Sequence, residues 1–200
     1  MNYQKELEKV LENLKSDESK PKLLLHACCA PCSSYCLEYL SSYFDITVLY
    51  YNPNIESEAE FNKRAGELER FVKECKTIEA ASVVIIDHDS SDFYNVVDGM
   101  EDFAEGGERC FKCYELRLRK TAEYAKENGY DYITTTLTIS PHKNAEKINE
   151  IGMSLAKEYG IQYLLSDFKK NNGFKRSIEL SEEYKLYRQN YCGCEFSKRD

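Results

Sequence analysis

The segment Lys22-Leu23-Leu24-Leu25-His26-Ala27 is a short and nearly continuous apolar run, with Pro21 before it and the pair Cys28-Cys29 directly after it. A strand that is apolar on both faces is typical of a parallel sheet that helices cover on both sides. We therefore expect this run to be a buried strand, with two thiols at the point where the strand ends.

Apolar runs of strand length alternate with segments of helical periodicity along the rest of the chain. We predict further strands at residues 46–51, 82–87, 130–136 and 161–165, and helices at residues 7–14, 33–43, 56–76, 110–128 and 148–159. Residues 90–107 have only a partial pattern. The alternation predicts one α/β domain over residues 1–200, with a parallel sheet of about five strands, right-handed crossovers, helices on both faces and a helical C-terminal segment.

The composition favours a soluble chain whose cysteines are in the reduced, thiol form. The 200 residues suffice for a core without disulfide bonds. The N-terminal stretch lacks the pattern of a signal peptide, and the longest apolar runs are too short to span a membrane, so we expect a cytoplasmic protein. In a reducing cytosol, cysteines are more often metal ligands or catalytic thiols than structural bridges.

The net charge of −8, from 35 acidic and 27 basic residues, argues against a protein that coats nucleic acid without specificity. The sign reverses locally between residues 169 and 188. The basic residues there are Lys169, Lys170, Lys175, Arg176, Lys185 and Arg188. This basic segment is either a local phosphate-binding face or an ordinary solvated helix face.

Seven of the nine cysteines fall into three tight groups. These are Cys28-Cys29-x-x-Cys32, Cys110-x-x-Cys113 and Cys192-Gly193-Cys194. Cys36 and Cys75 stand alone in helical patterns, and we interpret them as small buried hydrophobic residues. Grouped thiols in a soluble chain indicate a metal cluster, thiol redox chemistry or both.

The predicted topology brings several of these groups to one edge of the sheet. In open parallel sheets, ligands bind beyond the carboxyl ends of the strands. The pair Cys28-Cys29, the loop Ser140-Pro141-His142-Lys143 and Asp167 each follow a predicted strand. Cys110-x-x-Cys113 opens a helix, where the helix dipole favours a thiolate. We therefore expect thiols that are distant in the sequence to meet.

The residues alone leave three kinds of chemistry open. Cys28, Cys29, Cys110 and Cys113 supply the four thiolates that an iron–sulfur cluster commonly takes. The same four thiolates also suit a structural zinc site. Thiol chemistry without a metal is the third alternative.

The other candidate residues are less specific. Gly193 permits the bend that a small, reducible disulfide between Cys192 and Cys194 requires, although these thiols are also possible ligands of a second metal, together with Cys32. His26 and His142 are candidates for proton transfer. The cations Arg109, Arg117 and Lys143 are candidates for contact with an anionic substrate, or are helix-surface charges.

Six fragments, taken in order, carry a resemblance that covers nearly the whole chain. They are His26-Ala27-Cys28-Cys29-Ala30-Pro31-Cys32-Ser33-Ser34, Tyr51-Asn52-Pro53-Asn54-Ile55, Glu108-Arg109-Cys110-Phe111-Lys112-Cys113-Tyr114-Glu115-Leu116-Arg117-Leu118, Ser140-Pro141-His142-Lys143, Asp167-Phe168-Lys169-Lys170 and Tyr187-Arg188-Gln189-Asn190-Tyr191-Cys192-Gly193-Cys194. This ordered set resembles the QueH-type epoxyqueuosine reductases.

The resemblance implies an activity and a fold. The activity is the last step of queuosine synthesis, the reductive removal of the epoxide oxygen from epoxyqueuosine at the wobble position of tRNA. The fold is a Rossmann-like domain related to the adenine-nucleotide alpha-hydrolases. The partners implied are tRNA and an electron donor that no motif in the chain identifies.

The resemblance also implies roles for individual residues. Cys28, Cys29, Cys110 and Cys113 would bind a [4Fe-4S] cluster, and Cys192 and Cys194 would be a redox-active pair. Cys32 and Asp167 are the candidate contacts of a second, mononuclear metal, iron or zinc. His142 is a candidate catalytic residue, and Lys169, Lys170, Lys175, Arg176 and Arg188 would hold tRNA phosphates. The rival hypotheses are a zinc-stabilised nucleic-acid or protein-binding module and a cofactor-free thiol–disulfide oxidoreductase.

Overall fold

The computed structural model describes residues 1–15 and 19–198. Its helices are α1 (Tyr3–Leu14), α2 (Ala30–Leu40), α3 (Glu58–Glu74), α4 (Ser91–Val97), α5 (Glu108–Asn128), α6 (Ala145–Tyr159) and α7 (Gly173–Glu183), with 3-10 turns η1 (Thr136–Ile139) and η2 (Glu195–Ser197). Its strands are β1 (Lys22–His26), β2 (Asp45–Tyr50), β3 (Ala81–Ile85), β4 (Tyr132–Thr135) and β5 (Gln162–Tyr163). The predicted α/β class is confirmed.

The five strands form one sheet in the order β3-β2-β1-β4-β5, and every pairing is parallel. The chain moves from β1 outward through β2 to β3, and then returns to the other side of β1 with β4. Two neighbouring parallel strands whose connections leave in opposite directions create a crevice at their carboxyl ends. The switch point of this sheet therefore lies between the ends of β1 and β4.

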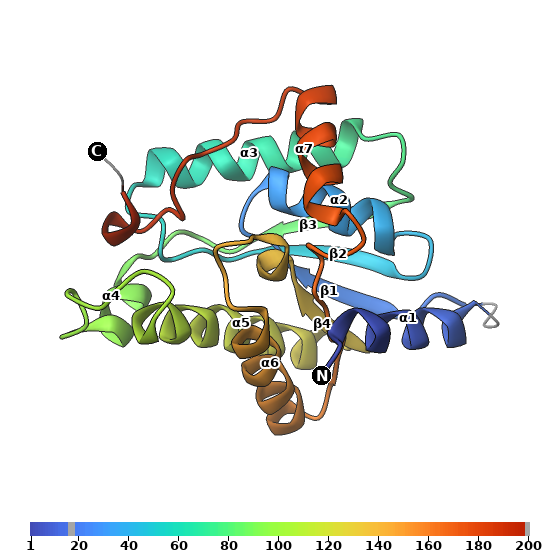
Figure 1. Cartoon of the computed structure of the whole chain (residues 1–200), viewed down its shortest axis with the longest axis horizontal. Helices are drawn as coiled ribbons and strands as arrows, with labels where there is room; N and C mark the ends of the chain where they lie inside the picture. The colour runs from blue at the N-terminus through green and yellow to red at the C-terminus, as the bar shows by residue number, and fades with distance from the viewer. Residues whose placement is uncertain (16–18, 199–200) are drawn as a thin grey trace.

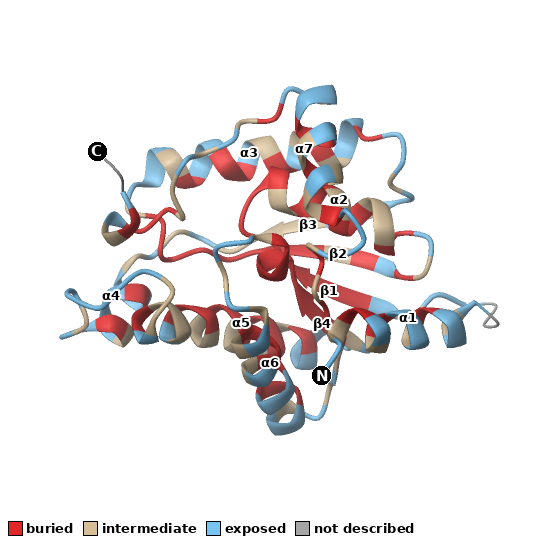
Figure 2. Cartoon of the chain, viewed as in Figure 1, coloured by how far each residue is buried: buried red, intermediate tan, exposed pale blue. Residues whose placement is uncertain are grey.

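Helices cover both faces of the sheet, with α2, α3 and α7 on one side and α5 and α6 on the other (Figure 1). The alternation within β1 explains this layering, because successive side chains point to opposite faces. Leu23 and Leu25 join the core formed with α1, α2 and α3, whereas Leu24 joins the core formed with α5 and α6. The central strands are accordingly buried on both faces (Figure 2).

Three elements differ from the sequence-based expectation near the carboxyl edge of the sheet. Helix α2 begins at Ala30 rather than near residue 33, because Pro31 suits the first turn of a helix. Strand β4 ends at Thr135, whose hydroxyl accepts a hydrogen bond from the backbone N–H of Leu137 and starts η1. Residues 90–107 contain the short helix α4. Within the described ranges, no helix is both long and apolar enough to cross a membrane.

Candidate functional site

The first cysteine group begins at the switch point of the sheet. Cys28 follows β1 directly, and its backbone N–H donates to the hydroxyl of Thr136, which follows β4, at 3.4 Å. Cys29 is the extended N-terminal capping residue of α2, and Cys32 lies in the first turn of that helix. The early start of α2 therefore folds Cys32 back toward the pair.

Cys28, Cys29 and Cys32 form a compact group of thiols, in which all three sulfur atoms lie within 4.8 Å of one another. The Sγ atoms of Cys28 and Cys29 are 3.8 Å apart. Hydrogen bonds from the thiols of Cys29 and Cys32 hold the pKa of Cys28 well below its usual range, and the same sharing raises the pKa of Cys29 to about 12. This set of ligand atoms is able to hold one metal ion.

The other two cysteine groups meet in an adjoining cavity. Cys110, Cys113, Cys192 and Cys194 line a small cavity of about 30 Å³. The thiols of Cys28, Cys29 and Cys32 open onto a larger cavity of about 270 Å³. The residues shared by the two linings are Glu105, His142, Lys143, Cys192 and Ser197. All seven grouped cysteines thus border two neighbouring cavities.

The segment that carries Cys192 and Cys194 closes one side of the site. The backbone N–H of Cys192 donates to the hydroxyl of Ser197 at 3.2 Å, and the thiol of Cys194 lies 3.4 Å from the same hydroxyl. Burial raises the pKa of Cys194 above its ordinary value. In this structure all nine cysteines are free thiols.

Buried cations surround the thiols. Arg117 on α5 is 1% exposed, and its Nε donates to the carbonyl oxygen of Cys113 at 3.3 Å. Burial opposes the positive charge, but the neighbouring Cys113, Cys192 and Cys28 thiolates raise the pKa of Arg117. Its Nη2 has no hydrogen-bond partner among the described residues. A buried charge with an unsatisfied N–H group indicates a negative group in the cavity beside it.

The donor set fits an iron–sulfur cluster. Cys28, Cys29, Cys110 and Cys113 come from two segments that meet around Arg117 and the shared cavity wall. Thiolates around a cubane stand further apart than those around a single ion, because four irons and four sulfides lie between them. The tight spacing of Cys32 with Cys28 and Cys29 suits a single ion instead. The geometry therefore shows a set of metal ligands at Cys28, Cys29 and Cys32, with Cys110 and Cys113 in the adjoining cavity.

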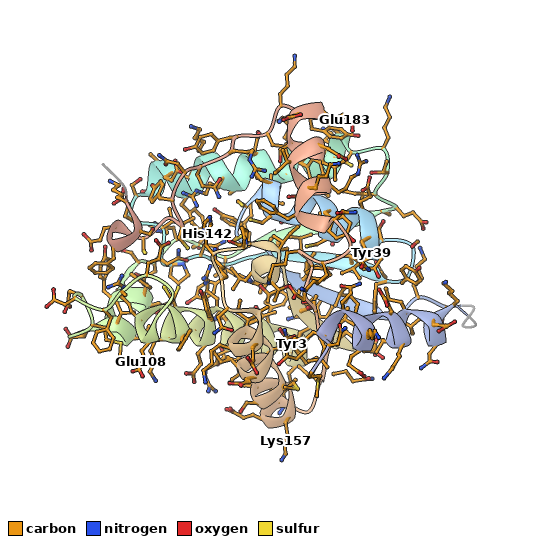
Figure 3. All side chains as sticks on the ribbon, viewed as in Figure 1. Tyr3, Tyr39, Glu108, His142, Lys157 and Glu183 are labelled. Carbon is orange, nitrogen blue, oxygen red and sulfur yellow. The ribbon has the colours of Figure 1, made fainter. Side chains whose placement is uncertain are left out.

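His26 has a structural position. Its ring is fully buried, with Nδ1 2.9 Å from the hydroxyl of Thr135 and Nε2 3.2 Å from the carbonyl oxygen of Tyr51. Burial and the nearby Arg117 lower the pKa of His26 to about 3, so the ring is neutral. A neutral ring that donates from Nε2 and accepts at Nδ1 joins β1 to its neighbours. The exposed His142 borders both cavities instead (Figure 3).

Asp167 and most of the predicted phosphate-binding residues lie away from the cysteines. The carboxylate of Asp167 is 2.6 Å from the ammonium group of Lys169, and Asp167 lines a separate groove with Lys170, beside α1. Lys175 is exposed on α7. Arg188 lines the larger cavity. The structure therefore brings only Arg188 of this set to the thiols.

Arg176 is held in an ion pair between α7 and α2. Its Nε and Nη2 donate to the two carboxylate oxygens of Glu38 at 2.8 and 2.7 Å. The two-pronged geometry is the strongest form of an arginine–carboxylate contact. Arg176 thus stabilises the packing of α7 on α2, and its charge is already paired.

Replacing Glu38 by glutamine is expected to lower the free energy of unfolding by about 1 kcal/mol at pH 7. The hydrogen bonds from Arg176 lower the pKa of Glu38 in the folded state. This stabilisation is complete above the unfolded pKa of about 4.3, and it is lost as pH falls through the lower folded-state pKa. Urea denaturation of both proteins as a function of pH measures it. A difference that stays constant on acidification would show that packing, and not charge, is responsible.

Two residues that contact the site were not predicted from the sequence. Arg64 on α3 reaches the backbone of Cys192, and Gln189 forms a side-chain hydrogen bond with Cys29 that lowers the pKa of this thiol. A signal for Arg64 existed, because it lies at helical spacing between the apolar residues Phe61 and Leu68. A charged residue on the apolar face of a helix indicates a buried charge.

Known proteins resemble this chain over most of its length. A family model described as "Epoxyqueuosine reductase QueH" matches residues 23–200. Relatives of that same name include proteins from Streptococcus pyogenes serotype M1, with 43% identity over 100% of this chain and 79% of the relative, and from Staphylococcus epidermidis, with 44% identity over 98% and 84%. A relative from Thermotoga maritima has 32% identity over 88% of this chain and 89% of its own length.

Proposed function

The chain belongs to the QueH family of epoxyqueuosine reductases, and from this membership we propose that it is the oxidoreductase that converts epoxyqueuosine to queuosine. The observation that carries the proposal is the convergence of seven cysteines, from three distant segments, on two adjoining cavities at the switch point of the sheet. A binding module would need only one set of metal ligands. The three groups instead offer a metal site together with free thiols.

The proposed reaction removes one oxygen atom from the substrate. Two electrons and two protons convert the epoxide to an alkene and water. Cys28, Cys29, Cys110 and Cys113 would hold a [4Fe-4S] cluster, which supplies electrons one at a time when bound. Cys32, beside Cys28 and Cys29, would contribute to a site for a single iron or zinc ion next to the cluster, and such an ion would act as a Lewis acid toward an oxygen atom.

The residues of the larger cavity have roles that follow from their positions. The cavity is close in size to small-molecule sites, which begin at about 300 Å³, so it accepts one nucleoside-sized group. His142 and Lys143 border both cavities, and from there they would meet the departing oxygen. Cys192 and Cys194 would supply or store an electron pair as a dithiol that is oxidised to a disulfide.

We propose tRNA as the carrier of the substrate. Bases that proteins read in single-stranded RNA are splayed from their neighbours, and the wobble nucleoside would enter the larger cavity in that way. Lys170 and Arg188 are the predicted phosphate contacts without an ion pair among the described residues, because Arg176 is paired with Glu38, Lys169 with Asp167, and the exposed Lys175 with Glu179 at 4.0 Å. The binding face therefore lies along α7 and the segment that follows it.

Metal analysis after anaerobic purification tests the proposal against its main rival. We expect a coloured protein with about four iron and about four labile sulfide per chain from the cluster, together with one further iron or zinc ion at the single-ion site. A colourless protein that contains zinc and neither iron nor sulfide would favour the zinc-stabilised binding module and contradict the reductase.

A further inference from the structure

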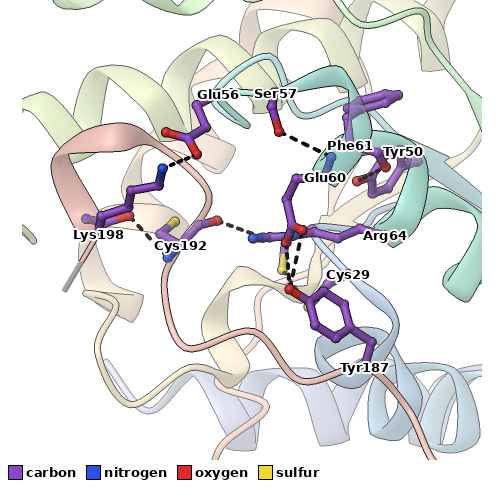
Figure 4. A network of polar contacts seen from close by, with 12 residues as sticks. Cys29, Tyr50, Glu56, Ser57, Glu60, Phe61, Arg64, Tyr187, Cys192 and Lys198 are labelled. Atoms are coloured by element: carbon purple, nitrogen blue, oxygen red, sulfur yellow. Dashed lines mark hydrogen bonds and ion pairs between the residues drawn. The ribbon is translucent and has the colours of Figure 1, made fainter. Parts of the chain in front are cut away.

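Arg64 is a buried cation between two of the cysteine groups. Its side chain on α3 is 1% exposed, and its Nε donates to Glu60 at 2.7 Å. Its Nη1 donates to the carbonyl oxygen of Cys192 at 3.0 Å (Figure 4). A single guanidinium group therefore joins helix α3 to the backbone of the Cys192-Gly193-Cys194 turn.

The same guanidinium faces a cysteine of the first group. Burial opposes the charge of Arg64, while Glu60, and Cys29 when it is ionised, raise the pKa of Arg64. The sulfur of Cys29 lies beside this arginine in the close view (Figure 4). The Nη2 group is buried without a hydrogen-bond partner among the described residues. The Nη2 group of Arg64 is therefore able to donate a hydrogen bond to a further negative group, in addition to Glu60.

The Cys192-Gly193-Cys194 turn packs directly against Arg64. Gly193 has a φ of +122°, a conformation that side chains rarely adopt. A Cβ atom at this position would lie 3.2 Å from Nη1 of Arg64 and 3.0 Å from Ile55. The carbonyl oxygen of Gly193 also accepts a hydrogen bond from the backbone N–H of Glu56 at 3.0 Å. The turn is therefore shaped to pack directly on the arginine.

Glu60 holds Arg64 in place and binds the preceding part of the same segment. Its two carboxylate oxygens accept from the hydroxyl of Tyr187 at 3.2 and 3.3 Å. The ring of Tyr191 lies under the guanidinium, 5.1 Å from its carbon. One carboxylate and one arginine of α3 thereby fix residues 187–193 over the cavity.

Resting on the function proposed above, we propose that Arg64 is a positioning residue that fixes the Cys192-Gly193-Cys194 turn against the metal site and compensates the negative charge at Cys29. A metal-bound thiolate and each added electron make the site more negative, and a fixed cation favours both. Loss of this cation makes reduction of the site harder. Loss of its hydrogen bond to Cys192 releases the turn.

The variants Arg64→Met and Arg64→Lys separate these two effects. In the iron-loaded protein, Arg64→Met is expected to retain iron, to shift the midpoint potential to a more negative value, and to lower kcat/KM by about 10- to 100-fold. Arg64→Lys keeps the charge without the planar fork, so it should restore most of the potential but not the full rate. Potentials are measured by a redox titration that is monitored by electron paramagnetic resonance.

Hydrogen exchange in the metal-free protein tests the positioning role of Arg64 independently of the proposed function. Hydrogen exchange of the amides in residues 190–194 should be faster in Arg64→Met and in Glu60→Gln than in the wild type. Arg70→Met is the matched control, because Arg70 lies on the same helix and donates to the carbonyl oxygen of Tyr184, further from the cysteines. Exchange and potential in that variant should match the wild type.

The outcomes separate the two proposals. Arg64→Met with unchanged exchange and unchanged potential would overturn the role of Arg64, whatever the reaction. Faster exchange in the metal-free variant, combined with a wild type that binds no iron, would support the positioning role and contradict the reductase. If Arg64→Met does not fold, Arg64→Gln, which also removes the charge, provides both readouts, and Glu60→Gln provides the exchange readout alone.

Discussion

Replacing Cys113 by serine is expected to deplete the protein of iron and to lower reduction of epoxyqueuosine by about 100-fold or more, since even groups that only support a metal ligand contribute 10- to 100-fold. Cys113 is buried in the second turn of α5, and its backbone carbonyl accepts a hydrogen bond from Arg117. Serine does not ionise near neutral pH and is a poor ligand for iron. We expect the same result for Cys110→Ser, one helical turn away.

Cys75→Ser is the control for this prediction. Cys75 is also buried, but it ends α3 beside Thr77, and neither cavity lining includes it. Its iron content and activity should equal those of the wild type. Full activity in a protein with both Cys110→Ser and Cys113→Ser would support a cofactor-free thiol–disulfide oxidoreductase and exclude the proposed cluster.

Replacing Cys192 by serine is expected to leave the iron content unchanged and to lower steady-state reduction by about 100-fold. Cys192 borders both cavities and lies one residue from Cys194, so the pair is placed to exchange electrons with a group in either cavity. A single remaining thiol is unable to form the intramolecular disulfide that stores two electrons. Iron analysis and turnover assays on the same preparation measure both effects.

Ser197→Ala is the matched control for the substitution of Cys192. The hydroxyl of Ser197 binds the backbone of Cys192 and the thiol of Cys194, so its loss disturbs the turn but keeps both sulfur atoms. Turnover in this variant should fall less than in Cys192→Ser. Loss of iron from Cys192→Ser would instead identify this residue as a metal ligand and contradict the relay.

The layered fold was predictable because burial on both faces leaves a strong pattern. Runs such as Leu23-Leu24-Leu25 are apolar without interruption, and only a strand between two helix layers buries every side chain of such a run. The alternation of strands and helices then predicts a parallel sheet. The order of the strands was not predictable from periodicity, because periodicity contains no information about which edge a crossover returns to. The switch point beside Cys28 came from the structure.

The contents of the site were predictable only in part. The cysteine groups were visible as motifs, but the close approach of Cys32 to Cys28 and Cys29 depends on where α2 begins. The pairing of Arg176 with Glu38 depends on how α7 packs on α2, which no local pattern shows. Asp167 follows β5 as expected, yet its carboxylate pairs with Lys169. Tertiary contacts decide these positions.

The most direct test uses the reconstituted protein with a chemical reductant and tRNA that contains epoxyqueuosine, under anaerobic conditions. The products are digested to nucleosides and analysed by mass spectrometry. We predict that epoxyqueuosine loses one oxygen atom and becomes queuosine, and that Cys113→Ser abolishes this change while Cys75→Ser does not. Unconverted epoxyqueuosine in the presence of protein with an intact cluster would contradict the proposed function.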